Sequence, residues 1–277
     1  MPLLAAPVVP SGRWGVRPQP SLTAEGLVLR PWAPVDVPAV RAAYEDPAIR
    51  WWHARSMSDD DEALAWIDAK NAAWRDERAA EWAVTVAPAP APIPGLVPAP
   101  VPVPVSVPVP VSVSVSVADR APAPALALAG AHRPPGPADD ASPVPTSGPL
   151  PRVAPARHLA TPPLRRLDAP PAGTVVGRVA LHHLDLYEGF GALAYWVVPS
   201  ARGRRVAVRA GAEVLRWAFE ELGLHRVEVE HSTRNEASCR VAELLGCRAE
   251  GVRRGHALHA DGHHDMHLHA RLRTDVP

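Results

Sequence analysis

Residues 190–246 decide the fold and read FGALAYWVVPSARGRRVAVRAGAEVLRWAFEELGLHRVEVEHSTRNEASCRVAELLG. Residues 192–198 are apolar and β-prone, which predicts a buried strand. Between residues 206 and 222 the apolar side chains follow helical spacing. Residues 227–230 alternate as in a strand, and Asn235 suits the N-cap of a second helix. The predicted order is therefore strand, loop, helix, strand, helix.

The loop before the first of these helices is basic and reads Arg202-Gly203-Arg204-Arg205. A helix N-terminus has backbone N–H groups without helical partners and a partial positive charge. A pyrophosphate fits such a place, and arginines add full charges around it. Surface arginines that only keep a loop soluble are the plainer interpretation, and the loop composition alone leaves both open.

The order Arg202-Gly203-Arg204-Arg205-Val206-Ala207 resembles the acetyl-CoA pyrophosphate loop of the GNAT superfamily of N-acetyltransferases, Q/R-x-x-G-x-G/A. The phrases AYWVVPSARGR, WAFEELGLHRVEV, HSTRNEASCRVAELLG and HDMHLHARL resemble the ribosomal-protein N-terminal (Rim-type) branch. The likeness covers Leu27–Val86 and Val175–Leu272. It implies an α/β fold with a mixed, mostly antiparallel central sheet, a splayed parallel strand pair and about four flanking helices.

The resemblance also implies an activity, namely transfer of an acetyl group from acetyl-CoA to a primary amine by direct attack in a ternary complex. The acceptor would be a protein N-terminal α-amino group or a small-molecule amine. The positions that the family uses for the cofactor are here Val197, Val198, Arg202, Gly203, Arg204, Arg205, Val206, Ala207, Asn235 and Ser238. The Ser238 hydroxyl would protonate the departing thiolate, although a plain helix cap explains Asn235 and Ser238 equally well.

Two positions depart from the family pattern. Arg205 stands where the family has glycine, and right-handed helical angles there would let its side chain swing outward and leave cofactor binding weakened. Ala192 stands where many relatives have a glutamate that serves as base, which leaves Glu188 in the adjacent turn and the histidines 182 and 183 on the neighbouring strand. These departures motivate an alternative, a catalytically degenerate fold that binds CoA or a partner without turnover.

The remaining sequence divides into an irregular tail (1–26), a split acetyltransferase domain (27–86 and 174–272), an insertion (87–173) and a short tail (273–277). Alternating proline in the insertion removes backbone donors and fixes φ, so we expect a disordered, extended Pro/Val/Ala-rich segment. Residues 111–117 (VSVSVSV) alternate like a strand and are compatible with a sheet edge. Further strands are expected at 27–32, 80–86, 174–184, 247–254 and 264–272, and helices at 37–44 and from residue 58.

Composition limits the partners and the compartment. Twenty-nine basic residues balance 29 acidic ones, so charge does not favour nucleic acid or a membrane as a partner. Two cysteines, Cys239 and Cys247, are too few for a disulfide framework, which favours a reducing cytoplasm. The sequence leaves the oligomeric state open between a monomer and a homodimer.

Two clusters of residue types invite other interpretations. Four tryptophans (Trp51, Trp52, Trp66 and Trp74) lie in the region that overlies the acceptor in the resembled family, although core packing is the plainer role for each. Six histidines near the C-terminus suggest a metal, but their spacing matches no recognisable ligand motif, so no metal is expected. They are His256, His259, His263, His264, His267 and His269.

Overall fold

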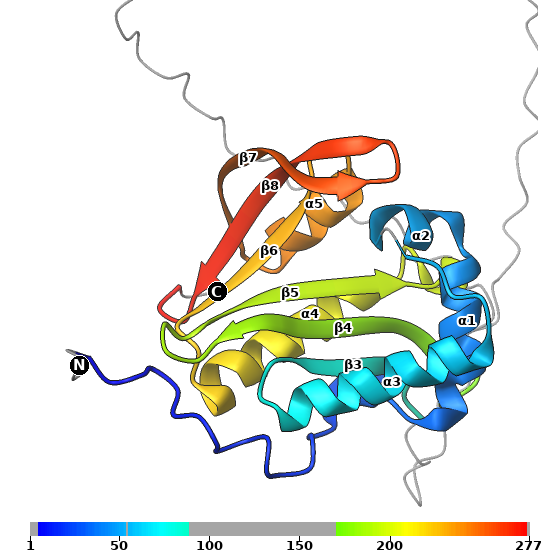
Figure 1. Cartoon of the computed structure of the whole chain (residues 1–277), viewed down its shortest axis with the longest axis horizontal. Coiled ribbons are helices and arrows are strands. Elements are labelled where there is room, and N and C mark those ends of the chain that lie inside the picture. Colours follow the sequence, from blue (N-terminus) through cyan, green and yellow to red (C-terminus); the bar gives the residue numbers. More distant parts are fainter. Residues whose placement is uncertain (1–4, 54, 89–169, 276–277) are drawn as a thin grey trace, which may run out of the picture. The chain divides into compact units, whose positions relative to one another are not determined.

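The computed structural model describes residues 5–53, 55–88 and 170–275, and its frame is an eight-stranded sheet of order β1-β2-β3-β4-β5-β6-β8-β7 (Figure 1). The strands are β1 (Leu22–Ala24), β2 (Leu27–Pro31), β3 (Ala80–Val86), β4 (Val175–Asp185), β5 (Phe190–Val197), β6 (Arg226–Ser232), β7 (Arg248–His259) and β8 (Gly262–Leu272). All neighbours pair antiparallel except β5 and β6, which are parallel. The mixed, mostly antiparallel sheet that the sequence predicted is confirmed.

Strand alternation separates two hydrophobic cores. On one face Leu29, Trp82 and Val179 are fully buried and pack with α4 (Val206–Trp217). On the other face Trp196 packs with Ile67 and with the remainder of a second cluster. Burying one such large apolar side chain contributes about 1.5–3 kcal/mol. The helices are therefore held on opposite faces of the sheet, and the sheet positions them.

The parallel pair separates after three residue pairs. Phe190, Gly191 and Ala192 pair with residues 226–228. Beyond them β5 continues to Val197 and β6 to Ser232, but the two strands no longer pair with each other. Figure 1 shows the two strands side by side at one end and diverging toward the other. This is the splayed pair predicted from the sequence, and it leaves strand edges that must find other partners.

Five α-helices occur in the described part of the chain, one more than expected. They are α1 (Val37–Glu45), α2 (Pro47–His53), α3 (Asp60–Arg75), α4 and α5 (Glu236–Leu244). The sequence patterns missed α2, because seven residues are too short for a periodic apolar pattern. Asp46 precedes it, and its Oδ1 accepts a hydrogen bond from the Ile49 N–H at 2.9 Å.

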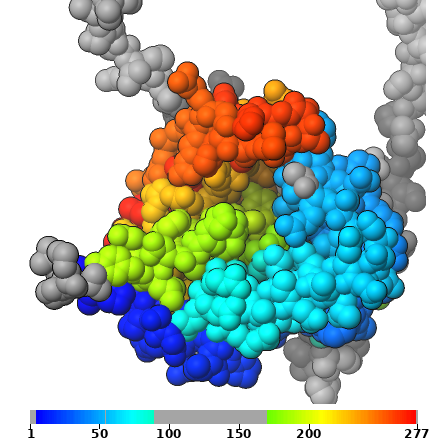
Figure 2. All heavy atoms as spheres, viewed as in Figure 1, coloured from blue at the N-terminus to red at the C-terminus, as the bar shows by residue number. Residues whose placement is uncertain are grey.

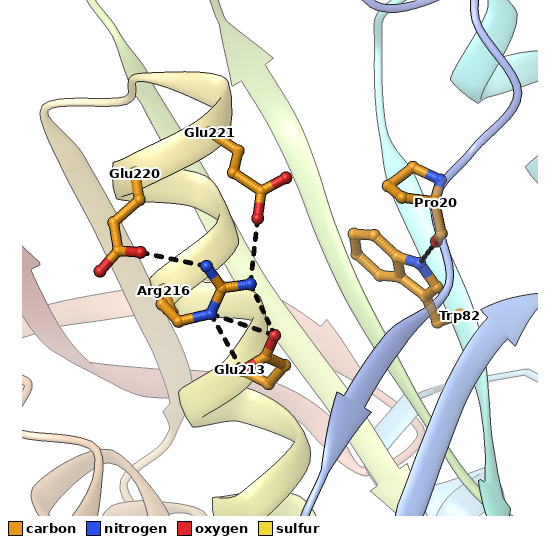
Figure 3. A network of polar contacts seen from close by, with 6 residues as sticks. All are labelled: Pro20, Trp82, Glu213, Arg216, Glu220 and Glu221. Carbon is orange, nitrogen blue, oxygen red and sulfur yellow. Dashed lines mark hydrogen bonds and ion pairs between the residues drawn. The ribbon is translucent and has the colours of Figure 1, made fainter.

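The end of α4 is a π-helical turn, Ala218–Leu222, closed by Gly223 in the left-handed conformation with φ 88°. Arg216 donates to Glu213 at 2.7 Å, to Glu220 at 3.0 Å and to Glu221 at 3.0 Å (Figure 3). A π turn adds one residue, so the side chain five positions on also comes within reach. The same figure shows Trp82 Nε1 donating to the Pro20 carbonyl at 2.8 Å, which satisfies a fully buried indole.

The N-terminal segment differs from the irregular tail that was expected. It contains β1, and Val9 and Trp14 are buried in the core of the α4 face. Glu77 accepts hydrogen bonds from the N–H groups of Gly12, Trp14 and Gly15 at 2.6–3.0 Å. Proline-rich composition suggested a tail because it excludes regular structure, but it does not exclude packing through single apolar side chains.

The C-terminal hairpin of β7 and β8 is longer than predicted, because register shifts near residues 250 and 254–256 let pairing continue. Most of the insertion expected at 87–173, including the VSVSVSV stretch, lies at residues 89–169, which are outside the described residues. Among the helices that the structure describes, none has the length and apolar character needed to cross a bilayer.

Candidate active site

A cavity of about 660 Å³ opens where β5 and β6 separate. Its walls come from α2, β5, the loop before α4, β6, α5 and the β7–β8 hairpin. In Figure 2 a recess is visible between the hairpin (orange to red), β5 (green) and the α1–α2 region (blue). The predicted site residues that line the cavity are Val197, Arg202, Gly203, Arg205, Val206, Ala207, Asn235 and Ser238.

The main chain of β5 offers polar groups to this cavity. The Gly189 carbonyl accepts the His225 N–H at 2.7 Å, so it points toward β6. Because strand groups alternate with a period of two, the N–H and C=O groups of Leu193, Tyr195 and Val197 point the same way. They lie beyond the last pair at Ala192, and no described strand pairs with them. An extended ligand could bond to this edge as another strand would.

Val198 was predicted to bind the cofactor through its main chain, but its N–H and C=O groups both have hydrogen-bond partners within the protein. Its N–H donates to the Val176 carbonyl at 3.1 Å, and its carbonyl accepts the Ala201 N–H at 3.0 Å. Val198 has the opposite alternation to Val197 and therefore faces β4. Tyr195, which was not singled out for its main chain, has the alternation that faces the cavity.

The loop before α4 turns through the left-handed region twice. Gly203 has φ 76°, and Arg205, the N-cap residue, has φ 55° and ψ 25°. The right-handed angles under which the Arg205 side chain would swing outward are therefore not adopted, since the chain follows the path that glycine would take. The N–H groups of Val206 and Ala207 belong to the first helical turn and have no helical acceptors. Both residues line the cavity, so the anion-binding geometry is present.

The arginines of this loop point in different directions. Arg202 donates to Asp46 Oδ1 at 2.6 Å and to the Val197 carbonyl at 3.1 Å, which ties the loop to α2 and β5. Arg204 lines a separate hollow of about 160 Å³ and not the main cavity, so its predicted cofactor role is not supported. Arg240 on α5 lines the main cavity and was missed, because it lies far from the loop in the sequence.

Ser238 and Asn235 are brought to the same wall. The Ser238 N–H donates to Asn235 Oδ1 at 3.1 Å, so the helix-cap interpretation of Asn235 is confirmed. Tyr195 Oη donates to the Ser238 carbonyl at 3.3 Å, which connects α5 to β5 across the splay. Burial raises the pKa of Tyr195 to about 12, so its phenol stays protonated at neutral pH. The catalytic role of Ser238 stays a prediction.

Glu188, the carboxylate proposed as base, lies in the wrong place. It is exposed in the turn before β5, at the end where β5 and β6 are still paired. From Phe190 to Tyr195 alone a strand rises about 16 Å. Glu188 does not line the cavity, and the sequence suggested it only because it precedes the strand by two residues.

Glu230 is a cavity-lining carboxylate that sequence analysis missed. Ala192 pairs with Glu228, so the side chains of Glu228 and Glu230 lie on the face where the family's glutamate would stand. Glu230 Oε1 is buried and has no hydrogen-bond partner among the residues that the structure describes. Arg253 approaches its carboxylate at 3.6 Å, which is long for a hydrogen bond and short enough for charge attraction, and His256 Nε2 lies 3.5 Å from it.

Of the aromatic residues and histidines near the site, some line the cavity and others do not. Trp52 and His53 on α2 line the cavity, whereas Trp66 and Trp74 are buried in the cores and Trp51 is 38% exposed. Burial, with the nearby Arg178 charge, lowers the pKa of His53 to about 4, so its imidazole is neutral at pH 7. Burial, with His183, lowers the pKa of His182 to about 4, but His182 is not part of the cavity wall.

A chain of side-chain hydrogen bonds closes the hairpin end of the cavity. Ser232 Oγ lies 2.9 Å from His264 Nδ1, and His264 Nε2 lies 2.7 Å from Asp261 Oδ1. Arg234 donates to the other oxygen of Asp261 at 2.7 Å. His264 is 2% exposed, so this chain orients Ser232 and anchors the hairpin turn to β6.

Comparison with known proteins gives a consistent result. A family model described as "Acetyltransferase (GNAT) domain" matches residues 164–248. A Bacillus subtilis protein named "Putative ribosomal N-acetyltransferase YdaF" is 32% identical over 104 residues, which are 37% of this chain and 56% of that protein. The aligned part therefore spans a little over half of that relative.

Solved structures share the fold. RimJ of Mycobacterium smegmatis, in complex with CoA-disulfide, aligns with TM-score 0.57 and 16% identity over 93% of this chain and 88% of its own. RimL, the ribosomal L7/L12 α-N-protein acetyltransferase, aligns with TM-score 0.56 and 10% identity over 91% and 98%. At these identities the likeness concerns the fold alone.

Proposed function

Because this chain contains an acetyltransferase domain of the GNAT type, we propose that it transfers the acetyl group of acetyl-CoA to a primary amine. The observation that carries the proposal is the splay of β5 and β6, which leaves an unpaired strand edge along a cavity that ends at the N-terminus of α4. An extended amide-containing arm followed by a pyrophosphate has the chemistry that this edge and this helix end would bind.

The residues for the cofactor divide by chemistry. The main chains of Val197 and Tyr195 would bond to the pantetheine amides. The N–H groups of Val206 and Ala207 would bind the pyrophosphate. Arg205, Arg240 and Arg202 would add charge at that end, each charge-assisted hydrogen bond contributing about 1.5–3 kcal/mol.

The reaction would proceed by direct attack. The amine nitrogen bonds to the thioester carbonyl carbon, the carbon–sulfur bond breaks, and CoA leaves as a thiolate. Glu230 would take the proton that the nitrogen loses, and the Ser238 hydroxyl would protonate the sulfur. Glu230 replaces the glutamate missing at residue 192, since it lies on the same face of the next strand.

For the acceptor we propose a protein N-terminal α-amino group. The named relatives include a ribosomal N-acetyltransferase and an α-N-protein acetyltransferase. An α-amine has a reference pKa near 8, compared with about 10.4 for lysine, so more of it is unprotonated at pH 7. A spermidine N-acetyltransferase is also among the structural neighbours, so a polyamine is the comparison substrate to include.

The test measures free thiol release from acetyl-CoA with N-terminal peptides, the same peptides blocked at the α-amine, and spermidine. Turnover with only the unblocked peptides supports the proposal. Glu230→Gln should then lower kcat and leave KM little changed. Turnover with spermidine alone would move the acceptor class to polyamines. Calorimetric binding of acetyl-CoA without turnover on any amine would instead favour the catalytically degenerate module.

A further inference from the structure

A cluster of one cysteine and three histidines lies between α5, β6 and β8. It consists of His231, Cys239, His267 and His269, whose ligand atoms all lie within 4.8 Å of one another. We propose that this cluster is a structural site for a tetrahedral, thiolate-binding divalent cation, with zinc as the natural occupant. The family match, the relatives and the proposed reaction assign nothing to it.

Three distances among His267, His269 and Cys239 are close to those of a tetrahedral zinc site, and all four ligand atoms lie within 4.8 Å of one another. With zinc–nitrogen bonds of about 2.0–2.1 Å and zinc–sulfur bonds of about 2.3 Å, two nitrogens lie about 3.3 Å apart, and sulfur and nitrogen about 3.5 Å. His269 Nε2 lies 3.3 Å from His267 Nδ1. Cys239 Sγ lies 3.8 Å from each of these two nitrogens. Two imidazole nitrogens and one sulfur, the atom types that zinc binds, therefore lie close around one point.

The fourth ligand is an unpartnered buried imidazole. His231 is 6% exposed, and its Nε2 is buried with no hydrogen-bond partner in the described part of the chain. Its Nδ1 lies 2.8 Å from the Ser232 carbonyl, so Nδ1 carries the proton and Nε2 keeps its lone pair. The His231 ring lies 5.2 Å from that of His269, centroid to centroid, and His231 pairs with His267 across β6 and β8, which places its imidazole beside the other ligands.

His269 is also a buried imidazole with one ring nitrogen near a backbone carbonyl. It is 1% exposed, and its Nδ1 lies 3.4 Å from the Cys247 carbonyl, which leaves Nε2 for the cation. A hydrogen bond from the second ring nitrogen to a carbonyl is the usual support for a histidine ligand. Four protein ligands complete a tetrahedron and leave no open position, so the site would be structural and not catalytic.

The place of the cluster indicates what the cation would do. Cys239 follows Ser238 on α5, and His231 lines the active-site cavity. A cation here would fix the start of α5 to β6 and β8, on the wall that carries Asn235 and Ser238. It would therefore hold one side of the splay in position for the cofactor.

The test uses untagged full-length protein, stripped with a chelator, kept reduced and titrated with Co²⁺ alone. We expect one equivalent to bind, with the visible bands of tetrahedral cobalt and a near-ultraviolet thiolate-to-cobalt band. Cys239→Ser should lose the thiolate band, and His267→Ala should weaken binding by at least about tenfold. His263→Ala removes an exposed histidine of the same strand and should match the wild type.

Two further readouts do not depend on the variants folding normally. Cysteine binds as a thiolate, so wild-type protein should release the thiol proton when Zn²⁺ binds. Zn²⁺ should also raise the melting temperature of the stripped wild-type protein, because it binds only the folded cluster. Absence of cobalt bands in the wild type, or an unchanged thiolate band in Cys239→Ser, would overturn the proposal.

Discussion

Arg205 combines a strained backbone with a useful side chain. Its φ of 55° lies in the left-handed region, which costs a residue with a Cβ about 1–2 kcal/mol compared with right-handed angles. Arg205 is one of the residues that line the cavity at the N-terminus of α4. Since the backbone already follows the glycine path, the first-turn N–H groups keep their places. In the proposed complex the arginine would therefore add charge to the site without displacing the pyrophosphate.

We predict that Arg205→Gly raises the melting temperature by about 1–3 °C, because relief of strain outweighs the entropy that glycine adds to the unfolded chain. The same variant should bind acetyl-CoA about 10- to 100-fold more weakly, since one charge-assisted hydrogen bond is lost. Calorimetry and titration at two salt concentrations measure both. Arg205→Ala is the control, because it keeps the strain and loses the charge. Tighter binding in the glycine variant would show that the side chain obstructs the phosphate.

Ser238 is predicted to protonate the sulfur of the leaving thiolate, so its substitution should change kcat. Ser238→Ala should lower kcat by about 100-fold with little change in acetyl-CoA affinity, because the hydroxyl acts only in the transition state. Ser238→Thr keeps a hydroxyl and should recover most of the rate. Steady-state kinetics with thiol detection provide the measurement. If the alanine and threonine variants turn over like the wild type, Ser238 serves only the first turn of α5.

Between elements, a buried ion network connects β3, β4 and α3. Glu81 is 3% exposed and accepts from Arg178 Nε at 2.6 Å, and Lys70 Nζ lies 3.0 Å from its other oxygen. Burial alone would raise the pKa of Glu81, but the charges of Arg178 and Lys70 hold it below 4.5. Removing one member leaves an uncompensated buried charge, which costs more than the intact pair contributes.

We predict that Glu81→Leu lowers the free energy of unfolding by about 3–5 kcal/mol, and that the double variant Glu81→Leu/Arg178→Met recovers most of the loss. The depressed pKa implies stability that is present above pH 4.5 and lost as the pH falls below that value. Denaturant unfolding at pH 7 and at pH 4 tests both statements. A double variant as unstable as the single one, or wild-type stability unchanged at pH 4, would contradict them.

For the whole molecule, the insertion is expected to be dispensable for folding. β3 and β4 meet at its two ends, where Val86 N–H donates to the Thr174 carbonyl at 3.0 Å and Gly173 N–H donates to the Val86 carbonyl at 2.9 Å. The two ends are therefore already placed as the arms of a hairpin. A short turn can join them without a change in either strand.

Replacing Pro88–Ala172 with an Asn-Gly turn should leave a cooperatively melting protein of equal or higher melting temperature, since a shorter loop costs about 2–3 kcal/mol less to close. Acetyl-CoA affinity should be unchanged, because all of the described residues that line the cavity lie outside the deleted stretch. Calorimetric melting and titration against the full chain are the measurements. Loss of cooperative melting would show that the deleted residues contribute to the fold.

The sequence by itself determined the elements and the loop that begins α4. Period-two and helical patterns depend on near neighbours, so residues 190–246 identified β5, α4, β6 and α5 before any contact was known. The resemblance supplied the splay. What local patterns could not predict is which side chains meet: Glu230 in place of Glu188, Arg240 in place of Arg204, and Tyr195 in place of Val198 at the cavity.

Only the tertiary structure showed which of these residues line the cavity. Strand alternation and pairing register convert a shift of one residue into a change of face. The same reason explains the His231, Cys239, His267 and His269 cluster. Its members come from β6, α5 and β8 and have no spacing that a chain-local pattern could detect. They meet because β6 pairs with β8 in one register and α5 packs against β6 and β7.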